Sequence, residues 1–321
     1  MHELTEMQTT PPSAPLTAAA PAHVDFAQTF QVEGVDVRGR LVRMGPALDA
    51  VLDAHDYPKP VSIMLAETLT LAVTLASALK YEGIFTLQVQ SDGPISLLVA
   101  DITSEGALRG YARFDEARVS EASEGKSAPV PRLLGAGHLA FTVDQGADME
   151  RYQGIAELDG ATLADCAHNY FRHSEQLDTA IFVSARVADV NSDAAAGALM
   201  VQRMPNAKND DEEHEDGWRR AVAILASLTE AELLDSELSS ESLLFRLYHE
   251  DGVRAYKAYD LFHRCRCSRD KVAMTLKAFP RAEITTDDGQ SQVVCEFCKA
   301  DYTFTSEDLD ALFDPADAET A

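Results

Sequence analysis

The sequence predicts an α+β protein with a large mixed α/β N-terminal domain, a helical linker and a small C-terminal domain. Three observations support this division: strand-like and helix-like patterns mix from residue 24 to about 204, like charges fill residues 209–216, and two cysteine pairs lie near the C-terminus. We therefore expect a flexible tail at 1–23, a core domain at 24–205, an acidic and helical linker at 206–258 and a cysteine-bearing domain at 259–315.

The tail contains a Thr-Thr-Pro-Pro run and an Ala/Pro stretch, without a basic region followed by a continuous apolar one. It therefore lacks the pattern of a secretory signal. Such a composition buries too little apolar area to offset the entropy of ordering, which indicates flexibility. We expect a cytoplasmic protein, and in that reducing compartment clustered cysteines are more often metal ligands or catalytic groups than structural disulfides.

The core pattern predicts strands at residues 35–44, 85–89, 95–102, 138–143 and 181–187, and helices at 61–79 and 163–177. The turn signal Ser91-Asp92-Gly93-Pro94 joins two of these strands into an expected hairpin. Polar residues such as Ser62 and Glu67 interrupt the segment 61–79, so we interpret it as a buried helix and not a membrane span.

The expected linker begins with the acidic block 209–216, which repels itself and is interpreted as solvated chain. Beyond it, apolar residues recur at helical spacing from Trp218 to Leu228 and from Leu243 to Tyr248, and the order of residues 239–241 indicates a helix N-cap. These patterns predict two or three short amphipathic helices.

The chain of 321 residues has 46% hydrophobic residues, enough for a buried core, and a formal net charge of −26. So acidic a surface disfavours sequence-independent binding to phosphate backbones or anionic lipid. We expect neither a nucleic acid nor a membrane partner.

Two cysteine pairs form the chemical motif of the chain. Cys265 and Cys267 are separated by one residue, Cys295 and Cys298 by two, and twenty-seven residues lie between the pairs. Four thiolates are the number that a closed tetrahedral zinc site needs. The spacing predicts one Zn²⁺ bound by these four residues, and a module of this size would take much of its folding free energy from the ion.

A purely structural zinc site is the first alternative, since most closed four-cysteine sites are structural. Two features favour a redox role: a disulfide within the Cys-x-Cys pair would close a small, strained ring, and cations near a cysteine favour the reactive thiolate. Residues 254–281 carry eight basic side chains against Asp260 and Asp270: Arg254, Lys257, Arg264, Arg266, Arg269, Lys271, Lys277 and Arg281.

The sequence also resembles the heat shock protein 33 family of redox-regulated holdase chaperones along nearly its whole length after the tail. The most specific segments are Cys265-Arg266-Cys267-Ser268, Val294-Cys295-Glu296-Phe297-Cys298 and residues 302–309. Residues 163–166, 170–177, 86–88, 92–94 and 98–101 of the expected core resemble the family as well. Two departures are Asp178, where the family often has proline, and the long tail.

The resemblance implies a zinc-bound, inactive monomer when the protein is reduced. Oxidative stress would convert the ligands into two redox-active disulfides, Cys265 with Cys267 and Cys295 with Cys298, and zinc would leave. The small domain and linker would then unfold, and a homodimer would hold unfolding client proteins without ATP. Such a chaperone is not an enzyme, and the sequence has neither a nucleotide-binding Gly-x-x-x-x-Gly-Lys-Ser/Thr motif nor a Gly-x-Ser-x-Gly elbow.

Other signals are weaker. A zinc-ribbon-like module that binds protein or nucleic acid through its basic stretch is the second hypothesis, and a thiol oxidoreductase the third. We interpret Gly135-Ala136-Gly137 as a turn, Cys166 as a small buried hydrophobic residue, and His168 and His173 as non-ligands. His263 is a potential substitute ligand, although four cysteines already fill the site.

Overall fold

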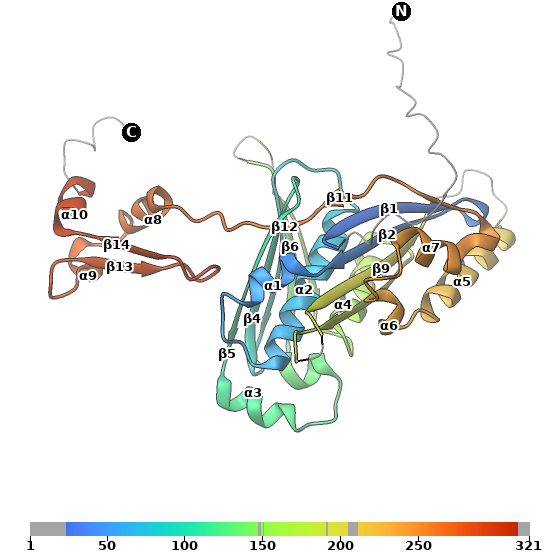
Figure 1. Ribbon diagram of the computed structural model, residues 1–321, viewed down its shortest axis with the longest axis horizontal. Coiled ribbons are helices and arrows are strands. Elements are labelled where there is room, and N and C mark those ends of the chain that lie inside the picture. The colour runs from blue at the N-terminus through green and yellow to red at the C-terminus, as the bar shows by residue number, and fades with distance from the viewer. Residues whose placement is uncertain (1–23, 147–148, 150, 191, 205–210, 314–321) are drawn as a thin grey trace, which may run out of the picture.

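The structure, a computed structural model, describes residues 24–146, 149, 151–190, 192–204 and 211–313. The expected tail, residues 209–210 of the acidic block and residues 314–315 lie outside the described residues. In Figure 1 a small C-terminal module lies at one end, a group of helices lies at the other, and two large sheets lie between them. This mixture of helix and sheet confirms the α+β fold class.

The first large sheet, sheet A, has the strand order β10-β1-β2-β9-β8, with β11 also paired to β1. All its pairings are antiparallel. Only two of its strands match expected ones, β2 and β8. Its strands are β1 (Phe26–Val32), β2 (Val37–Met44), β8 (Thr179–Arg186), β9 (Ala195–Arg203), β10 (Val253–Ala255) and β11 (Tyr259–Asp260).

The second large sheet, sheet B, has the order β12-β5-β4-β3-β6-β7. Its β3–β4 hairpin confirms the turn at residues 91–94, and β6 matches the strand expected at 138–143. The edge strand β12 comes from the C-terminal part of the chain and pairs in parallel with β5. The strands are β3 (Ile84–Ser91), β4 (Ile95–Thr103), β5 (Ala107–Phe114), β6 (Gly137–Asp144), β7 (Tyr152–Glu157) and β12 (Phe262–His263).

Helix α2 (Lys59–Ala76) packs between the two sheets and confirms the buried helix expected at 61–79. Within the described residues it is the one helix long and apolar enough to cross a membrane, yet 78% of that window is buried inside the protein. It is therefore a core helix. The remaining core helices are α1 (Pro46–Leu52), η1 (Glu33–Val35), α3 (Glu116–Ser123), η2 (Val130–Leu134), α4 (Leu163–Tyr170) and η3 (Phe171–Glu175), the last two covering the helix expected at 163–177.

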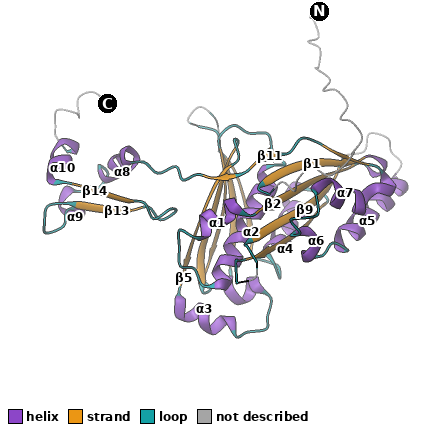
Figure 2. Cartoon of the chain, in the orientation of Figure 1, coloured by secondary structure: helices purple, strands orange, loops and turns teal. Residues whose placement is uncertain are grey.

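The opposite face of sheet A is covered by helices from the expected linker (Figures 1 and 2). These are α5 (Asp211–Ala226), α6 (Glu230–Leu233) and α7 (Ser240–Tyr248), which begins after the N-cap Ser239 and is followed by η4 (His249–Asp251). The interpretation of the acidic block as solvated chain is wrong for residues 211–216, which form the start of α5. Acidic side chains near a helix N-terminus interact favourably with its dipole, and Glu215 pairs with Arg219 one turn on.

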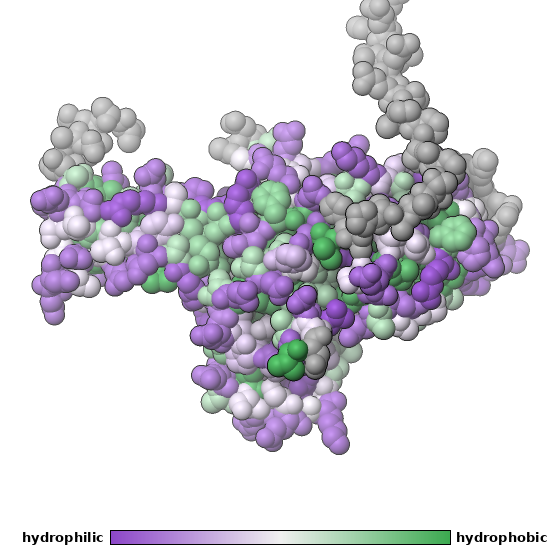
Figure 3. Space-filling view, in the orientation of Figure 1, coloured by the Kyte–Doolittle hydropathy of each residue, from purple (hydrophilic) through white to green (hydrophobic). Residues whose placement is uncertain are grey.

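The small C-terminal module contains the hairpin of β13 (Ser291–Val294) and β14 (Asp301–Phe304) together with α8 (Arg269–Leu276), α9 (Arg281–Ile284) and α10 (Ser306–Leu312). Its core has three buried apolar residues, Leu276, Phe304 and Leu309. So small a core supplies little folding free energy by itself. Hydrophilic residues cover much of the module and of the face shown in Figure 3.

Candidate metal centre

The first cysteine pair lies directly after an edge strand of the core. Phe262 and Arg264 donate backbone hydrogen bonds to Gly106 and Leu108 of the β4–β5 region, at 3.0 and 3.1 Å. Ser268 then accepts from the backbone N–H of Lys271 and caps α8. Cys265 and Cys267 are therefore held between a strand of sheet B and the first helix of the module.

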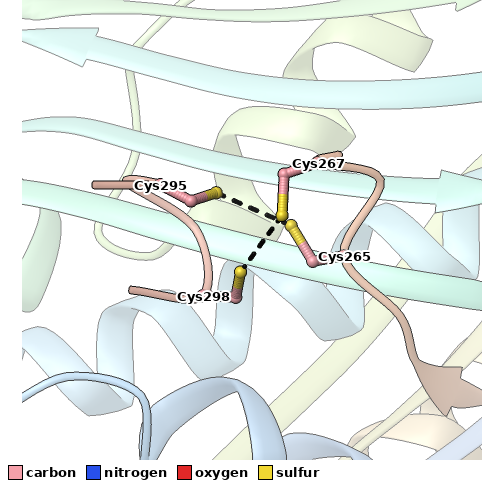
Figure 4. A group of neighbouring side chains, drawn as sticks. All are labelled: Cys265, Cys267, Cys295 and Cys298. Atoms are coloured by element: carbon pink, nitrogen blue, oxygen red, sulfur yellow. Dashed lines mark hydrogen bonds between the residues drawn. The ribbon is translucent and has the colours of Figure 1, made fainter. Parts of the chain in front are cut away.

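The second pair lies in the tight turn between β13 and β14. Cys295 donates a backbone hydrogen bond to Ala300 and accepts one from Lys299, both at 2.9 Å. Lys299 adopts the left-handed conformation, with φ of 57°. This conformation reverses the chain sharply, so that the sulfur atoms of Cys295 and Cys298 lie on the same side of the turn (Figure 4).

The four sulfur atoms converge, and all lie within 4.8 Å of one another. Cys265 Sγ is 3.7 Å from Cys295 Sγ, and Cys267 Sγ is 3.4 Å from Cys298 Sγ (Figure 4). A tetrahedral zinc site with Zn–S bonds of about 2.3 Å places its sulfur atoms about 3.8 Å apart. The donor set and its spacing fit a closed site for a soft or borderline divalent cation such as Zn²⁺.

Burial and hydrogen bonds move the pKa values of Cys265 and Cys298 in opposite directions. Partial burial acts to raise the pKa of Cys265, but donation from the Cys267 backbone and from neighbouring thiols lowers this pKa to about 7. Burial raises the pKa of Cys298 to about 12. Four thiolates this close repel one another, so a cation at the centre would favour the fully ionised set.

Two polar side chains outside the cysteine pairs contact the sulfur atoms. The hydroxyl of Tyr302 donates to Cys267 Sγ at 3.1 Å, and Arg109 Nη1 lies 4.0 Å from Cys265 Sγ. Tyr302 belongs to a segment that resembles the family, but Arg109 is on β5, and no sequence signal connects it with the site. The fold brings them together.

The basic stretch is used differently from the sequence interpretation. Five of its eight cations form ion pairs with carboxylates: Arg254 with Glu33, Arg264 with Glu105, Arg266 with Asp101, Arg269 with Asp308 and Arg281 with Asp310. Within the described chain, the arginine that contacts a sulfur atom, Arg109, belongs to β5 of the core instead. The stretch therefore holds segments together more than it activates thiols.

The weaker candidates stay outside the cysteine cluster. Cys166 is fully buried in α4, and burial raises its pKa to about 11. His168 and His173 each contact a backbone carbonyl, of Thr179 and Asn169. The buried Nε2 of His263 has no hydrogen-bond partner in the described chain, and His263 is not part of the four-cysteine cluster. Gly135, with φ of 69°, is in a turn before β6, as expected.

The fold and site together define a protein with a two-sheet α+β core whose C-terminal module is built around four potential metal ligands. A family model described as Hsp33 protein matches residues 25–305. The chain is 41% identical over 284 residues to the 33 kDa chaperonin of Caulobacter vibrioides, covering 87% of this chain and 94% of the relative. It is 36% identical over 299 residues to that of Ectopseudomonas mendocina, covering 92% and 97%.

Among solved structures, the chain is similar to the 33 kDa chaperonin (heat shock protein 33 homolog) of Thermotoga maritima. The TM-score is 0.75 at 24% identity, covering 90% of this chain and 98% of that one, which supports the fold. The chain belongs to the heat shock protein 33 family, and the sequence resemblance is confirmed. It is a chaperone. Its relatives are named chaperonins, a class of proteins whose function is not enzymatic.

Proposed function

We propose that this chaperone is a redox-regulated, ATP-independent holdase of the cytoplasm. The observation that carries the proposal is the meeting of four cysteine sulfur atoms within 4.8 Å, at the junction of the core and a module with little core of its own. Cys265, Cys267, Cys295 and Cys298 would hold one Zn²⁺ in the reduced, inactive monomer. The ion would supply folding free energy to the module and keep its four ligands ionised.

Oxidation would remove these ligands in pairs. A peroxide oxidises one thiolate to a sulfenic acid, and the thiol beside it then attacks that sulfur, forming a disulfide and releasing water. We propose the pairs implied by the family resemblance, Cys265 with Cys267 and Cys295 with Cys298. Each pair lies in one short segment, so each disulfide can form without the other half of the module.

Loss of the ligand set would unfold the module and then the linker. Helices α5, α6 and α7 cover an apolar face of sheet A, and helices this short depend on tertiary packing. Their release would expose apolar surface to unfolding client proteins and to a second copy of the chain in a homodimer. We retain the division into core 24–205, linker 206–258 and switch domain 259–315, and propose no nucleic acid or membrane partner for so acidic a chain.

The direct test is suppression of client aggregation by reduced and by peroxide-treated protein, with zinc release measured in parallel. We expect holding activity only after oxidation, rising together with zinc release and without ATP. Equal holding by the reduced, zinc-loaded protein would refute redox control. Activity that falls steeply with salt would instead support the binding-module hypothesis.

A further inference from the structure

A buried carboxylate of the core binds a residue that lies between two candidate metal ligands. Asp101 is on β4, and its side chain is only 6% exposed. It accepts hydrogen bonds from Thr86 Oγ1 at 2.6 Å and from Arg109 Nε at 2.8 Å, and it also pairs with the guanidinium of Arg266. Arg266 is the residue between Cys265 and Cys267.

The other cysteine pair contacts the same part of the core. Phe297, between Cys295 and Cys298, lies under the guanidinium of Arg109, whose central carbon is 3.8 Å from the ring centroid. The Tyr111 ring is 6.0 Å from the Phe297 ring, and His55 Nε2 is 3.2 Å from the Phe297 carbonyl oxygen. Figure 1 shows the turn beyond β13 reaching toward β5.

We propose that His55, Asp101, Arg109 and Tyr111 form a docking surface, here called the dock, which holds the assembled cysteine module on the core and slows the loss of its metal. The proposal rests on the proposed zinc site and deepens its regulation. The dock contacts Arg266 and Phe297, thirty-one residues apart in sequence. Arg266 contacts Asp101 and Phe297 contacts Arg109, and both contacts can form together only while the two cysteine pairs are held together, so the dock binds the assembled module better than the unfolded one.

Such a preference couples docking to metal retention. Any contact made only by the assembled state stabilises that state, and the coupling is reciprocal: the metal strengthens docking and docking strengthens retention of the metal. The Asp101–Arg266 pair is the strongest candidate for this coupling, because both side chains are largely removed from solvent and a second arginine orients the carboxylate. An exposed ion pair between the same two parts would contribute far less.

The chain offers a matched control for this comparison. Arg264, two residues before Arg266, pairs with Glu105 of the core at 2.8 Å, but the two side chains are 52% and 70% exposed. Both pairs join the same segment to sheet B by the same chemistry, and they differ in burial. Arg264→Gln therefore measures what an ordinary surface ion pair contributes.

The experiment compares zinc-loaded, reduced full-length proteins: wild type, Asp101→Asn, Arg266→Gln, the double variant and Arg264→Gln. Transfer of zinc to a coloured chelator is timed for each. We expect Asp101→Asn and Arg266→Gln each to release zinc about tenfold faster, and the double variant to be no faster than the single variants. Arg264→Gln should stay within about twofold of wild type.

The proposal would be overturned if both single variants released zinc at the wild-type rate. It would also be overturned if the increases in rate of the two single variants multiplied in the double variant. Asp101→Asn also perturbs Thr86 and Arg109 in the core, whereas Arg266→Gln leaves the core sequence intact and tests the dock if the other variant folds poorly. Failure of the proposed function would show in a separate measurement. Oxidised wild-type protein would then hold no client, whatever its rate of zinc release.

Discussion

Arg43 of β2 donates a hydrogen bond from Nη2 to the carbonyl oxygen of Glu232 in α6, at 3.1 Å. Its Nη1 donates to the carbonyl oxygen of Leu238, which precedes α7. Arg43 is only 4% exposed, so a buried core cation fixes the turn between two linker helices. A cation beside the last carbonyls of a helix also interacts favourably with its dipole.

Replacement of this cation should loosen the linker. Arg43→Met replaces the cation with an apolar side chain of moderate length and leaves the two carbonyls without their donor. The loss should weaken docking of the linker helices on sheet A by about 1–3 kcal/mol. We expect partial holding activity in the reduced variant and faster proteolysis within residues 211–260. Arg38→Met, at an exposed residue of the same strand, is the control. A reduced Arg43→Met protein as inactive and protease-resistant as wild type would contradict this role.

The metal ligands are tested by removing one pair. Cys295→Ser with Cys298→Ser leaves two thiolates, and a closed four-cysteine site then loses half of its donors. Metal analysis should show far less than one tightly bound zinc per chain, and the module should lose protection from proteolysis because its own core is small. Full retention of tightly bound zinc by the double variant would exclude these ligands.

Cys166 is expected to lie outside the switch. It is fully buried in α4, and its raised pKa of about 11 keeps it in the unreactive thiol form at neutral pH. Cys166→Ser should keep zinc content and activation by peroxide, although a hydroxyl in this site lowers the free energy of unfolding by about 1–3 kcal/mol. Mass spectrometry of oxidised wild type should find Cys166 unmodified. Loss of both zinc and activation in the variant would show that Cys166 takes part.

Local sequence patterns predicted the cysteine cluster and much of the core. Paired spacing identified all four cysteines that the structure brings together, and the Asp92-Gly93-Pro94 turn identified the β3–β4 hairpin. The first helical turns of α5 were not predicted. The repulsion between like charges was given more weight than the favourable interaction of acidic residues with a helix N-terminus. Sequence reasoning captured these features because they depend on neighbours in the chain.

The contacts between the module and the core were not predictable in this way. Strand β12 has two residues, too few for a periodic pattern, and its position depends on pairing with β5. Gly106 leaves room for the segment that leads into β12, since a Cβ at this position would lie 2.1 Å from the carbonyl oxygen of Asp260. No sequence pattern connects Arg109 and Asp101 with the module, and only the fold shows that Arg266 and Phe297 lie beside them.

Glu67 should make stability depend on pH. Burial on α2, and secondarily the negative charge of Glu230 on α6, raise the pKa of Glu67 from 4.5 to about 7. Glu230 itself accepts a hydrogen bond from Ser184 Oγ at 2.6 Å. Below about pH 4.5 Glu67 is protonated in folded and unfolded chains alike, so it then has no effect on stability.

As pH rises from about 4.5 to about 7, Glu67 ionises in the unfolded chain first, and its contribution to stability falls until both forms are ionised. Glu67→Gln should therefore unfold at higher urea concentration than wild type at pH 8, by at most about 3 kcal/mol, and differ little at pH 4. Other titrating groups are common to both proteins and cancel in the comparison. A difference that is the same at both pH values would show that charge on Glu67 is not the cause.

The last prediction concerns the contact between α5 and sheet A. Leu225 is buried on this helix, and Trp218 packs at the edge of the same apolar cluster. The Tyr248 hydroxyl of α7 donates to the carbonyl oxygen of Ala221, so α5 and α7 are fixed to each other. Without this packing, helices of such length are marginal in water.

Because Trp218 is the single tryptophan of the chain, its fluorescence reports on this contact directly. We expect its emission to shift toward that of a solvated indole on oxidation with mild heating, in step with client holding. Leu225→Asp places a charge in the cluster and should partly activate the reduced protein, with the same emission shift. Ala223→Asp, at an exposed position of α5, makes the same substitution without disturbing the cluster and should stay inactive. If oxidised, client-holding protein keeps the tryptophan emission of the reduced form, α5 stays packed around Trp218, and exposure of this face is not how clients are bound.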